Sequence, residues 1–452
     1  MRNLKRALSL ALASIMLLGM MVTGAGAASN SFTDFDQIVN QEAAEVTSGL
    51  GIFDGYTDGS FGPEKVVTRA EMAVIICKLL NGSDVDPGNF TGISKFTDVP
   101  AWAEGYVNYC AASGIVVGVG EGKFNPSATV TTVEAATMLL KALGYFTEED
   151  KLQADWKTVV TGRATGMHLY GSLTLAVDEG LTRDNVAELV FNTLFAQRVA
   201  YDDNRQLYVK NTNRDVVVTN GTQDYLNTFA ENTFHMWVVD GLVTANSFTD
   251  DDLSETTNNA PRTNVVFDAA AAQDYPATTY QGSTGSEYPF EYTTGLDMIG
   301  HSARVYYRME RNAPVVFAIA DRATKVEYIT YDSNLTNLSD AANAAGFRRN
   351  TIREFNSDDY KVNYDWDVTV GTLRRDSSAD NDVNLTGDKT IDPAKTLLVI
   401  SNSTDYAVDC VIVLDQYLDT VKRVVTKNDV TEYDLTTIDG VDQNILHGDA
   451  AQ

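Results

Sequence analysis

The feature that most constrains this chain is an internal repeat in its N-terminal part. The segment Gly51–Pro63 is matched without a gap by Gly114–Pro126, and at the same offset Val67–Glu71 is matched by Val130–Glu134. A third, weaker copy ends in Leu181–Asn185. Self-similarity of this kind marks structural units that cannot bury a hydrophobic face alone and must pack against each other. We therefore expect the copies to share one core.

Each copy has the pattern of two helices joined by a turn-rich loop. Thr68, Thr131 and Thr182 stand where a helix N-cap is expected, and in the first two copies a Glu three residues later predicts a capping box. Phe61 and Phe124 are expected to plug the core from the loops. Apolar residues then recur with helical spacing, which predicts a buried stripe in each copy. The stripes are Met72, Ile75, Ile76, Leu79 and Leu80; Ala135, Met138, Leu139, Ala142 and Leu143; and Val186, Leu189, Val190, Thr193 and Leu194.

The motifs together are similar to those of a known family. Phe32–Asp34, Tyr56–Pro63 and Val67–Glu71, with their later copies, resemble the S-layer homology (SLH) domain over about residues 32 to 195. The resemblance implies three repeats in an all-α, pseudo-three-fold prism. It also implies binding of a secondary cell-wall polysaccharide, typically pyruvylated, in grooves between repeats, with the Arg of the Thr-Arg-Ala-Glu motif engaging the acidic glycan.

Arg69 and Arg183 occupy that motif position, just inside a predicted helix N-terminus. Free backbone N–H groups and the positive end of the helix dipole should help each guanidinium to hold a carboxylate. Copy two has Thr132 instead, so we expect two of three grooves to bind. The alternative is that both arginines only pair with nearby surface carboxylates.

Three further residues are candidates for contacts with the polysaccharide. Asp98 and Trp102 open the second copy, where a sugar ring could stack on the indole. Trp102 could instead be a core wedge between helices. Asp34 is the third candidate, with capping of the first helix as its alternative role.

Charge and the first residues indicate export. The chain has 62 acidic and 34 basic residues and a net charge of −28, which argues against nucleic acid or an anionic membrane as partner. Arg2, Lys5 and Arg6, the apolar run 7–22 and a small-residue site ending at Ala27 predict a signal peptide over residues 1–27. The mature chain is then not inserted in a membrane.

The remaining chain divides, on its pattern, into an SLH domain and two β-rich modules. The SLH domain is expected over residues 28–198, with repeats at about 32–80, 95–145 and 154–195. Modules at 199–330 and 331–452 carry short strand-like runs between turns, and whether the second is shortened stays open. The runs are 216–219, 233–239, 265–267, 303–309, 315–320, 326–330, 397–400, 408–414 and 420–426.

No signature of catalysis or of a cofactor occurs in the sequence. The four histidines lack metal-ligand spacing, and HExxH, G-x-S-x-G and P-loop motifs are missing. The acidic run 250–252 fits a solvated linker better than a calcium loop. Cys77 and Cys110 fit small buried thiols, although they are the first pair to test for a disulfide.

Three functional classes remain. The leading one is a non-enzymatic surface-layer component on the wall of a Gram-positive-type bacterium, with self-assembly through the β-modules. The others are a wall-anchored adhesin and a wall-anchored hydrolase with its site in the C-terminal half.

Overall fold

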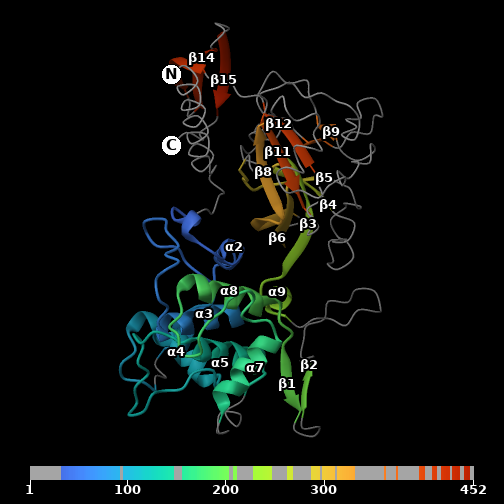
Figure 1. Ribbon diagram of the computed structural model, residues 1–452. Coiled ribbons are helices and arrows are strands. Elements are labelled where there is room, and N and C mark those ends of the chain that lie inside the picture. The colour runs from blue at the N-terminus through green and yellow to red at the C-terminus, as the bar shows by residue number, and fades with distance from the viewer. Residues whose placement is uncertain are drawn as a thin grey trace, which may run out of the picture. The chain divides into compact units, whose positions relative to one another are not determined.

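Figure 1 shows the computed structural model of the chain. It describes residues 32–91, 95–146, 155–202, 207–210, 228–246, 262–267, 287–295, 298–310, 313–330, 361–362, 373–374, 396–402, 410–414, 419–427, 430–437 and 442–447. The signal peptide, the strand expected at 216–219 and the acidic run 250–252 lie outside these residues. Within the described part, no helix has the length and apolar character needed to cross a membrane.

The chain divides into two compact units. One contains Asn30–Trp237 together with Tyr306–Ala318, and the other contains Val238–Val305 and the residues from Ile319 onward. The first unit holds the α-helices, and strands predominate later in the chain, as the sequence predicts.

Each repeat contributes a first and a second helix (Figure 1). The first helices are α2 (Gln41–Gly49), α4 (Ala101–Ala112) and α7 (Trp156–Gly166), and the second helices are α3 (Arg69–Asn81), α5 (Thr132–Leu143) and α8 (Arg183–Phe195). Short helices η1 (Phe35–Gln37), η2 (Pro87–Phe90) and α9 (Phe229–Asn232) lie between or after them.

The predicted helix starts are confirmed. The Thr68 hydroxyl accepts a hydrogen bond from the Glu71 N–H, and the Glu71 carboxylate accepts one from the Thr68 N–H at 2.8 Å. Thr131 and Glu134 form the second capping box. Thr182 accepts from the Asn185 N–H, without the reciprocal Glu. The third copy therefore keeps half of the motif, as its sequence indicates.

The helices pair between repeats. Helix α3 of the first repeat contacts α4 of the second, α5 of the second contacts α7 of the third, and α8 of the third contacts α2 of the first. The second helices also touch one another, since α5 contacts both α3 and α8. Each repeat thus depends on its neighbours for the burial of its helices.

Three backbone hydrogen bonds join the repeats into a ring. The Val67 N–H donates to the Leu181 carbonyl at 2.9 Å, the Leu181 N–H to the Val130 carbonyl at 3.0 Å, and the Val130 N–H to the Val67 carbonyl at 2.9 Å. These residues directly precede the three N-cap threonines. The ring therefore fixes the starts of the second helices relative to one another.

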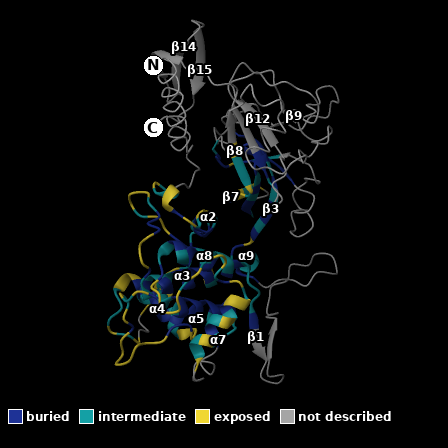
Figure 2. Cartoon of the chain, in the orientation of Figure 1, coloured by how far each residue is buried: buried dark blue, intermediate teal, exposed yellow. Residues whose placement is uncertain are grey.

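The core of the helical unit is the one that the apolar stripes predict (Figure 2). All the stripe residues are buried except Leu80, which is only partly covered. Phe61 and Phe124 are fully buried, each beside a second aromatic ring, Phe32 at 5.1 Å and Phe96 at 5.4 Å between centroids. The loops are consequently pinned to the core through their aromatic plugs.

Gly51 and Gly114 follow the first helices and need the conformational freedom of glycine. Their φ angles are +72° and +73°, in the left-handed region where a side chain is strained.

In the described part of the chain the strands that follow form five small sheets, with antiparallel pairing of β1 with β2, β9 with β10, β8 with β11, β11 with β12, β13 with β14, β14 with β15, β3 with β4 and β4 with β5. A five-stranded sheet has the order β5-β4-β3-β6-β7, and three-stranded sheets have the orders β12-β11-β8 and β13-β14-β15. Pairs β1-β2 and β10-β9 complete the described set. The bounds are β1 Val199–Asp202, β2 Leu207–Lys210, β3 Met236–Asn246, β4 Thr263–Phe267, β5 Glu287–Phe290, β6 Ser302–Glu310, β7 Ala313–Asp321, β8 Lys325–Thr330, β9 Lys361–Val362, β10 Leu373–Arg374, β11 Thr396–Ser401, β12 Cys410–Leu414, β13 Asp419–Lys427, β14 Val430–Thr437 and β15 Asp442–His447.

One pairing crosses the boundary expected at residue 331. Strand β8 pairs with β11, with Lys325 opposite Ser401 and Thr330 opposite Thr396. The strands before and after residue 331 therefore share a sheet.

Candidate functional site

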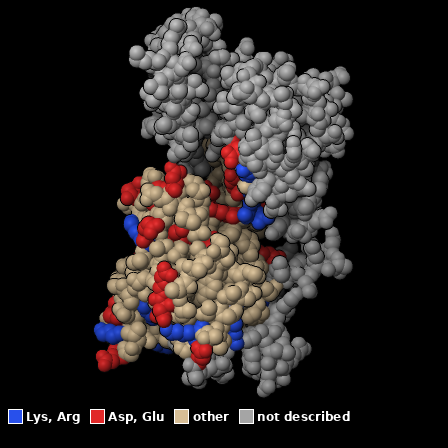
Figure 3. All heavy atoms as spheres, in the orientation of Figure 1, with Lys and Arg blue, Asp and Glu red and all other residues tan. Residues whose placement is uncertain are grey.

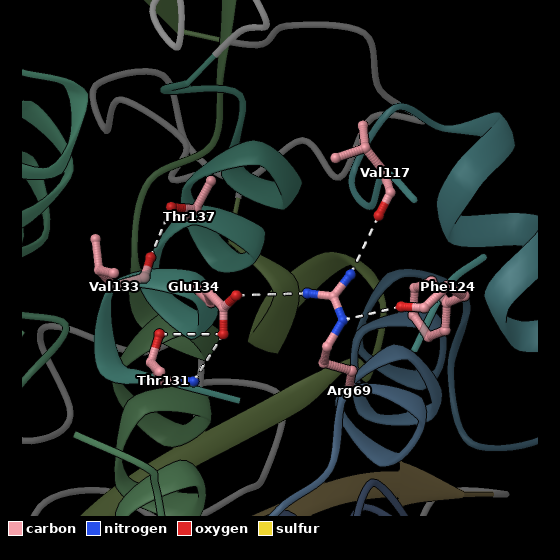
Figure 4. Close-up of polar contacts among 7 residues, drawn as sticks. All are labelled: Arg69, Val117, Phe124, Thr131, Val133, Glu134 and Thr137. Atoms are coloured by element: carbon pink, nitrogen blue, oxygen red, sulfur yellow. Dashed lines mark hydrogen bonds and ion pairs between the residues drawn. The ribbon is translucent and has the colours of Figure 1, made fainter. Parts of the chain in front are cut away.

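Arg69 is the first residue of α3 and reaches into the loop of the second repeat (Figure 4). Its Nε donates to the Phe124 carbonyl at 3.2 Å and its Nη2 to the Val117 carbonyl at 3.1 Å. Its Nη1 lies 3.6 Å from Oε1 of Glu134, the capping-box residue of α5. The guanidinium carbon is 4.8 Å from the centroid of the Phe124 ring. We call these contacts the Arg69 site.

Arg183 makes the corresponding contacts at the start of α8. Its Nε donates to the Phe61 carbonyl at 2.8 Å and its Nη2 to the Asp54 carbonyl at 2.9 Å, in the loop of the first repeat. The guanidinium carbon lies 5.3 Å from the Phe53 ring centroid and 4.9 Å from those of Tyr56 and Phe61. We call these contacts the Arg183 site. The arginine of the third repeat thus binds the loop of the first repeat in the same way that the arginine of the first repeat binds the loop of the second.

The expectation of free backbone N–H groups beside these arginines is wrong. The Arg69 N–H donates to the Ala128 carbonyl and the Ala70 N–H to the Pro126 carbonyl. In the same way, the Arg183 N–H donates to the Lys65 carbonyl and the Asp184 N–H to Pro63. The neighbouring repeat therefore satisfies the donors that a helix N-terminus usually leaves open. The starts of α3 and α8 therefore offer no free N–H at these residues to an anion.

Burial and charge act on the two guanidinium groups in opposite directions. Desolvation lowers the pKa of Arg69, and Glu134 raises it. Desolvation likewise lowers the pKa of Arg183, while Tyr56, Glu71 and acidic neighbours raise it. Arginine stays protonated in proteins, so both sites are cationic.

Each arginine shares its loop with one of the predicted aspartates. Asp34 accepts hydrogen bonds from the Phe61 N–H at 2.7 Å and the Gly62 N–H at 2.8 Å. Asp98 accepts from the Phe124 N–H at 2.8 Å and the Asn125 N–H at 2.9 Å, and these bonds lower its pKa.

The side chain of Asp34 makes no cap bond to η1, so the alternative that it caps the first helix is wrong. The two aspartates instead hold the peptides whose carbonyls the arginines bind. Their carboxylates are therefore occupied by the loops.

Trp102 is not brought into these contacts. It is the second residue of α4 and is 58% exposed, so the alternative of a core wedge is wrong. Thr132, in the motif position of the second repeat, is buried and donates from its hydroxyl to the Glu179 carbonyl at 3.3 Å. The third junction accordingly has no arginine at this position.

Two residues that sequence reasoning missed lie at the Arg183 site. The Lys65 ammonium is 3.3 Å from the centroid of the Tyr56 ring, which the Arg183 guanidinium also approaches. An alignment of the first two repeats could have singled out Lys65 and Tyr56, because Ala128 and Val119 replace them in the second repeat.

On the face drawn in Figure 3, acidic and basic side chains are both scattered among uncharged ones over the helical unit. No cluster of His, Cys, Asp or Glu suited to a metal ion occurs among the described residues.

Cys77 and Cys110 are buried and free, so the disulfide raised as a possibility is not formed.

The family comparison matches residues within the helical unit. The model of the S-layer homology domain matches residues 31–73 and 95–136. A cell surface protein of Thermoanaerobacter kivui is 29% identical over 210 residues, which is 46% of this chain and 27% of that protein. A surface layer protein of Brevibacillus choshinensis is 34% identical over 125 residues, 26% of this chain and 11% of that protein.

A protein named as an enzyme shares the similarity. The amylopullulanase of Thermoanaerobacterium thermosulfurigenes is 25% identical over 181 residues, 36% of this chain and 9% of that protein. The matched part of this chain thus spans about a quarter or less of each of these relatives. The chain carries S-layer homology repeats at residues 31–73 and 95–136, and it is similar to proteins named as a cell surface protein and a surface layer protein.

Proposed function

We propose that the three repeats hold this chain at the cell wall by binding an anionic secondary cell-wall polysaccharide. The observation that carries the proposal is the matched pair of sites, each with an arginine at a helix start bound to two loop carbonyls of the next repeat. The carbonyls fix each guanidinium in place and neutralise none of its charge. A fixed cation is what recognition of an acidic sugar requires.

The ring of hydrogen bonds supports a pseudo-three-fold arrangement of the repeats. In such an arrangement the Arg69 and Arg183 sites are two of three equivalent junctions. The third, with Thr132, does not contribute a charge of its own. A carboxylate such as that of a pyruvate ketal is the group we expect the arginines to engage.

The comparisons support a role of the repeats in placing this chain at the cell surface. Relatives named as a cell surface protein, a surface layer protein and an amylopullulanase each match part of this chain. Similarity to proteins with such different names favours a role in placing the chain at the cell over a shared activity. We propose that it places this chain on the wall of a Gram-positive-type bacterium, with the C-terminal strands as a non-enzymatic structural part that assembles with other copies.

Retention on isolated cell walls tests the proposal. The full chain should sediment with walls, and the double variant Arg69→Ala, Arg183→Ala should stay in the supernatant. Arg163→Ala is the matched control, because Arg163 donates to the Tyr145 carbonyl from within α7 and starts no helix. Retention of the double variant equal to that of the control would overturn the proposal.

A further inference from the structure

The Arg69 and Arg183 sites have the same backbone and different side chains. Asp54 and Phe61, which accept from Arg183, occupy the same repeat positions as Val117 and Phe124, which accept from Arg69. Differences between the sites therefore come from the side chains around a common frame.

The Arg183 site has a second cation and an aromatic ring that holds it. The Lys65 ammonium and the Arg183 guanidinium carbon lie 3.3 Å and 4.9 Å from the centroid of the Tyr56 ring. The electron-rich faces of aromatic rings attract cations in this way. In the Arg69 site Val119, which is 60% exposed, stands in place of Tyr56, and Ala128 stands in place of Lys65.

The backbone confirms that these positions correspond. The Arg183 N–H donates to the Lys65 carbonyl at 2.8 Å, and the Arg69 N–H donates to the Ala128 carbonyl at 2.9 Å. The Arg69 site therefore lacks both the ring and the second cation in an otherwise matched setting.

The two arginines also differ in how far their charge is neutralised. Nη1 of Arg69 lies 3.6 Å from the Glu134 carboxylate. The equivalent Glu71 accepts from the N–H and hydroxyl of Thr68, and Arg183 has no ion pair within the part of the chain that the structure describes. The Asp54 carboxylate is paired with Lys78 at 2.7 Å, and together with Glu71 and Asp34 it raises the pKa of Arg183 without forming an ion pair with it among the described residues.

Two cations brought to one ring repel each other until an anion joins them. Lys65 is exposed and can reach a ligand from solvent, and an anion bound by both cations converts their repulsion into two attractions. A guanidinium carries five N–H donors, and the structure gives Arg183 partners for two of them. The remaining Arg183 donors and the Lys65 ammonium, which both lie at the Tyr56 ring, are the groups we expect to bind an oxyanion.

We propose that Lys65 and Tyr56 make the Arg183 site the principal anion site of the chain, with the Arg69 site weaker. This rests on the proposed function and deepens it. Lys65 contacts the carboxylate of an acidic sugar, and Tyr56 positions Lys65 and Arg183 toward it. The ligand class is a saccharide that carries a carboxylate, whose charge both cations share.

Calorimetric titration of the full chain with a small acidic sugar tests this. The probe is a methyl hexoside with a 4,6-linked pyruvate ketal, and its uncharged methyl ester is the control ligand. We expect the ester not to bind, and Lys65→Ala or Tyr56→Val to weaken binding of the acid about tenfold, the size expected for loss of one charge-assisted contact. Tyr56→Phe keeps the ring and should bind as the unaltered chain does.

Control variants separate this effect from loss of folding or of net charge. Lys123→Ala removes a positive charge from an exposed lysine of the second-repeat loop and should leave affinity unchanged. Thermal unfolding of each variant checks that the helical unit is intact. The double graft Val119→Tyr, Ala128→Lys should strengthen the Arg69 site and restore binding in a Lys65→Ala background.

The outcomes distinguish this inference from the proposed function. Equal affinity of Lys65→Ala and the unaltered chain, a larger loss from Arg69→Ala than from Arg183→Ala, or failure of the unaltered chain to bind the ketal overturns the inference. The proposed function depends separately on wall retention of the full chain and its loss in the double arginine variant.

Discussion

The backbone N–H of Val67 donates a hydrogen bond to the carbonyl of Leu181, which closes the first repeat onto the third. Val130 holds the equivalent position in the second repeat. Its N–H donates to the Val67 carbonyl and its carbonyl accepts from the Leu181 N–H, so the three contacts form a closed ring. The helix pairings follow that ring, because each second helix packs on the first helix of another repeat. The contact and the pairings together make the three repeats depend on one another.

A chain that ends at residue 146, before the third repeat, should therefore not fold its first two repeats cooperatively. The loss of α8 exposes the face of α2 that it covers and leaves the Val67 and Val130 ring bonds incomplete. Thermal unfolding followed by circular dichroism should show a broad, shallow transition, compared with a sharp one for residues 28–198. A sharp transition in the shorter chain would show that the repeats fold independently.

Asp34→Ala should lower the free energy of unfolding of the helical unit. The substitution leaves the Phe61 and Gly62 N–H groups without their acceptor, and a lost acceptor for a buried donor costs about 1–3 kcal/mol. Denaturant titration measures the change. Asp36→Ala is the control, since Asp36 is exposed and only two residues away, and equal effects of the two substitutions would contradict the assignment.

Stability should fall as pH rises from about 4.5 to 8, because of Glu45. Burial in α2, with the neighbouring Glu42, raises the pKa of Glu45 from 4.5 to about 8. A carboxyl whose pKa is raised by folding stabilises the fold while protonated, and this contribution is lost as pH rises through the folded pKa. Each pKa unit corresponds to roughly 1.4 kcal/mol.

Thermal midpoints measured across this pH range would show the effect. Glu45→Gln should flatten the pH dependence and raise the midpoint at the alkaline end, because the amide stays neutral. The exposed Glu64→Gln should leave the dependence unchanged. An unaltered slope in Glu45→Gln would assign the dependence to other groups.

Cys77 and Cys110 should resist alkylation while the chain is folded. Both thiols are buried, and burial raises the pKa of Cys77 to about 11 and that of Cys110 well above its ordinary value. The thiolate is the reactive form, so iodoacetamide should label these residues only after denaturation. Peptide mass spectrometry reads out each site, and rapid labelling of the native chain would contradict the burial.

The sequence predicts the helical unit well because its signals are local and repeated. Capping threonines, apolar stripes and the plugs Phe61 and Phe124 each follow from spacing within one copy. The position of the strand-rich part in the chain follows from alternating runs and turns. These features depend on few residues that are distant in sequence.

The partners of the arginines could not be predicted in this way. Arg183 binds carbonyls of Asp54 and Phe61, and backbone groups leave no mark on residue type. The same reason explains why the helix N-termini were expected to be free, since Lys65 and Ala128 block them through their carbonyls. The pairing of β8 with β11 joins segments that are far apart in the chain, and the hydrophobic periodicity of each segment does not indicate its partner.

Closure of the repeats through backbone bonds has a consequence for how such a chain can change. In a linear array a unit can be added or lost at either end, because each contacts only its neighbours. Here the ring of hydrogen bonds among Val67, Val130 and Leu181 leaves no free end to which a further repeat could be added, so the number of repeats is held constant. Side chains can diverge within that constraint, which accounts for a third repeat that keeps Thr182 and Arg183, lacks the Glu of the capping box and still completes the ring.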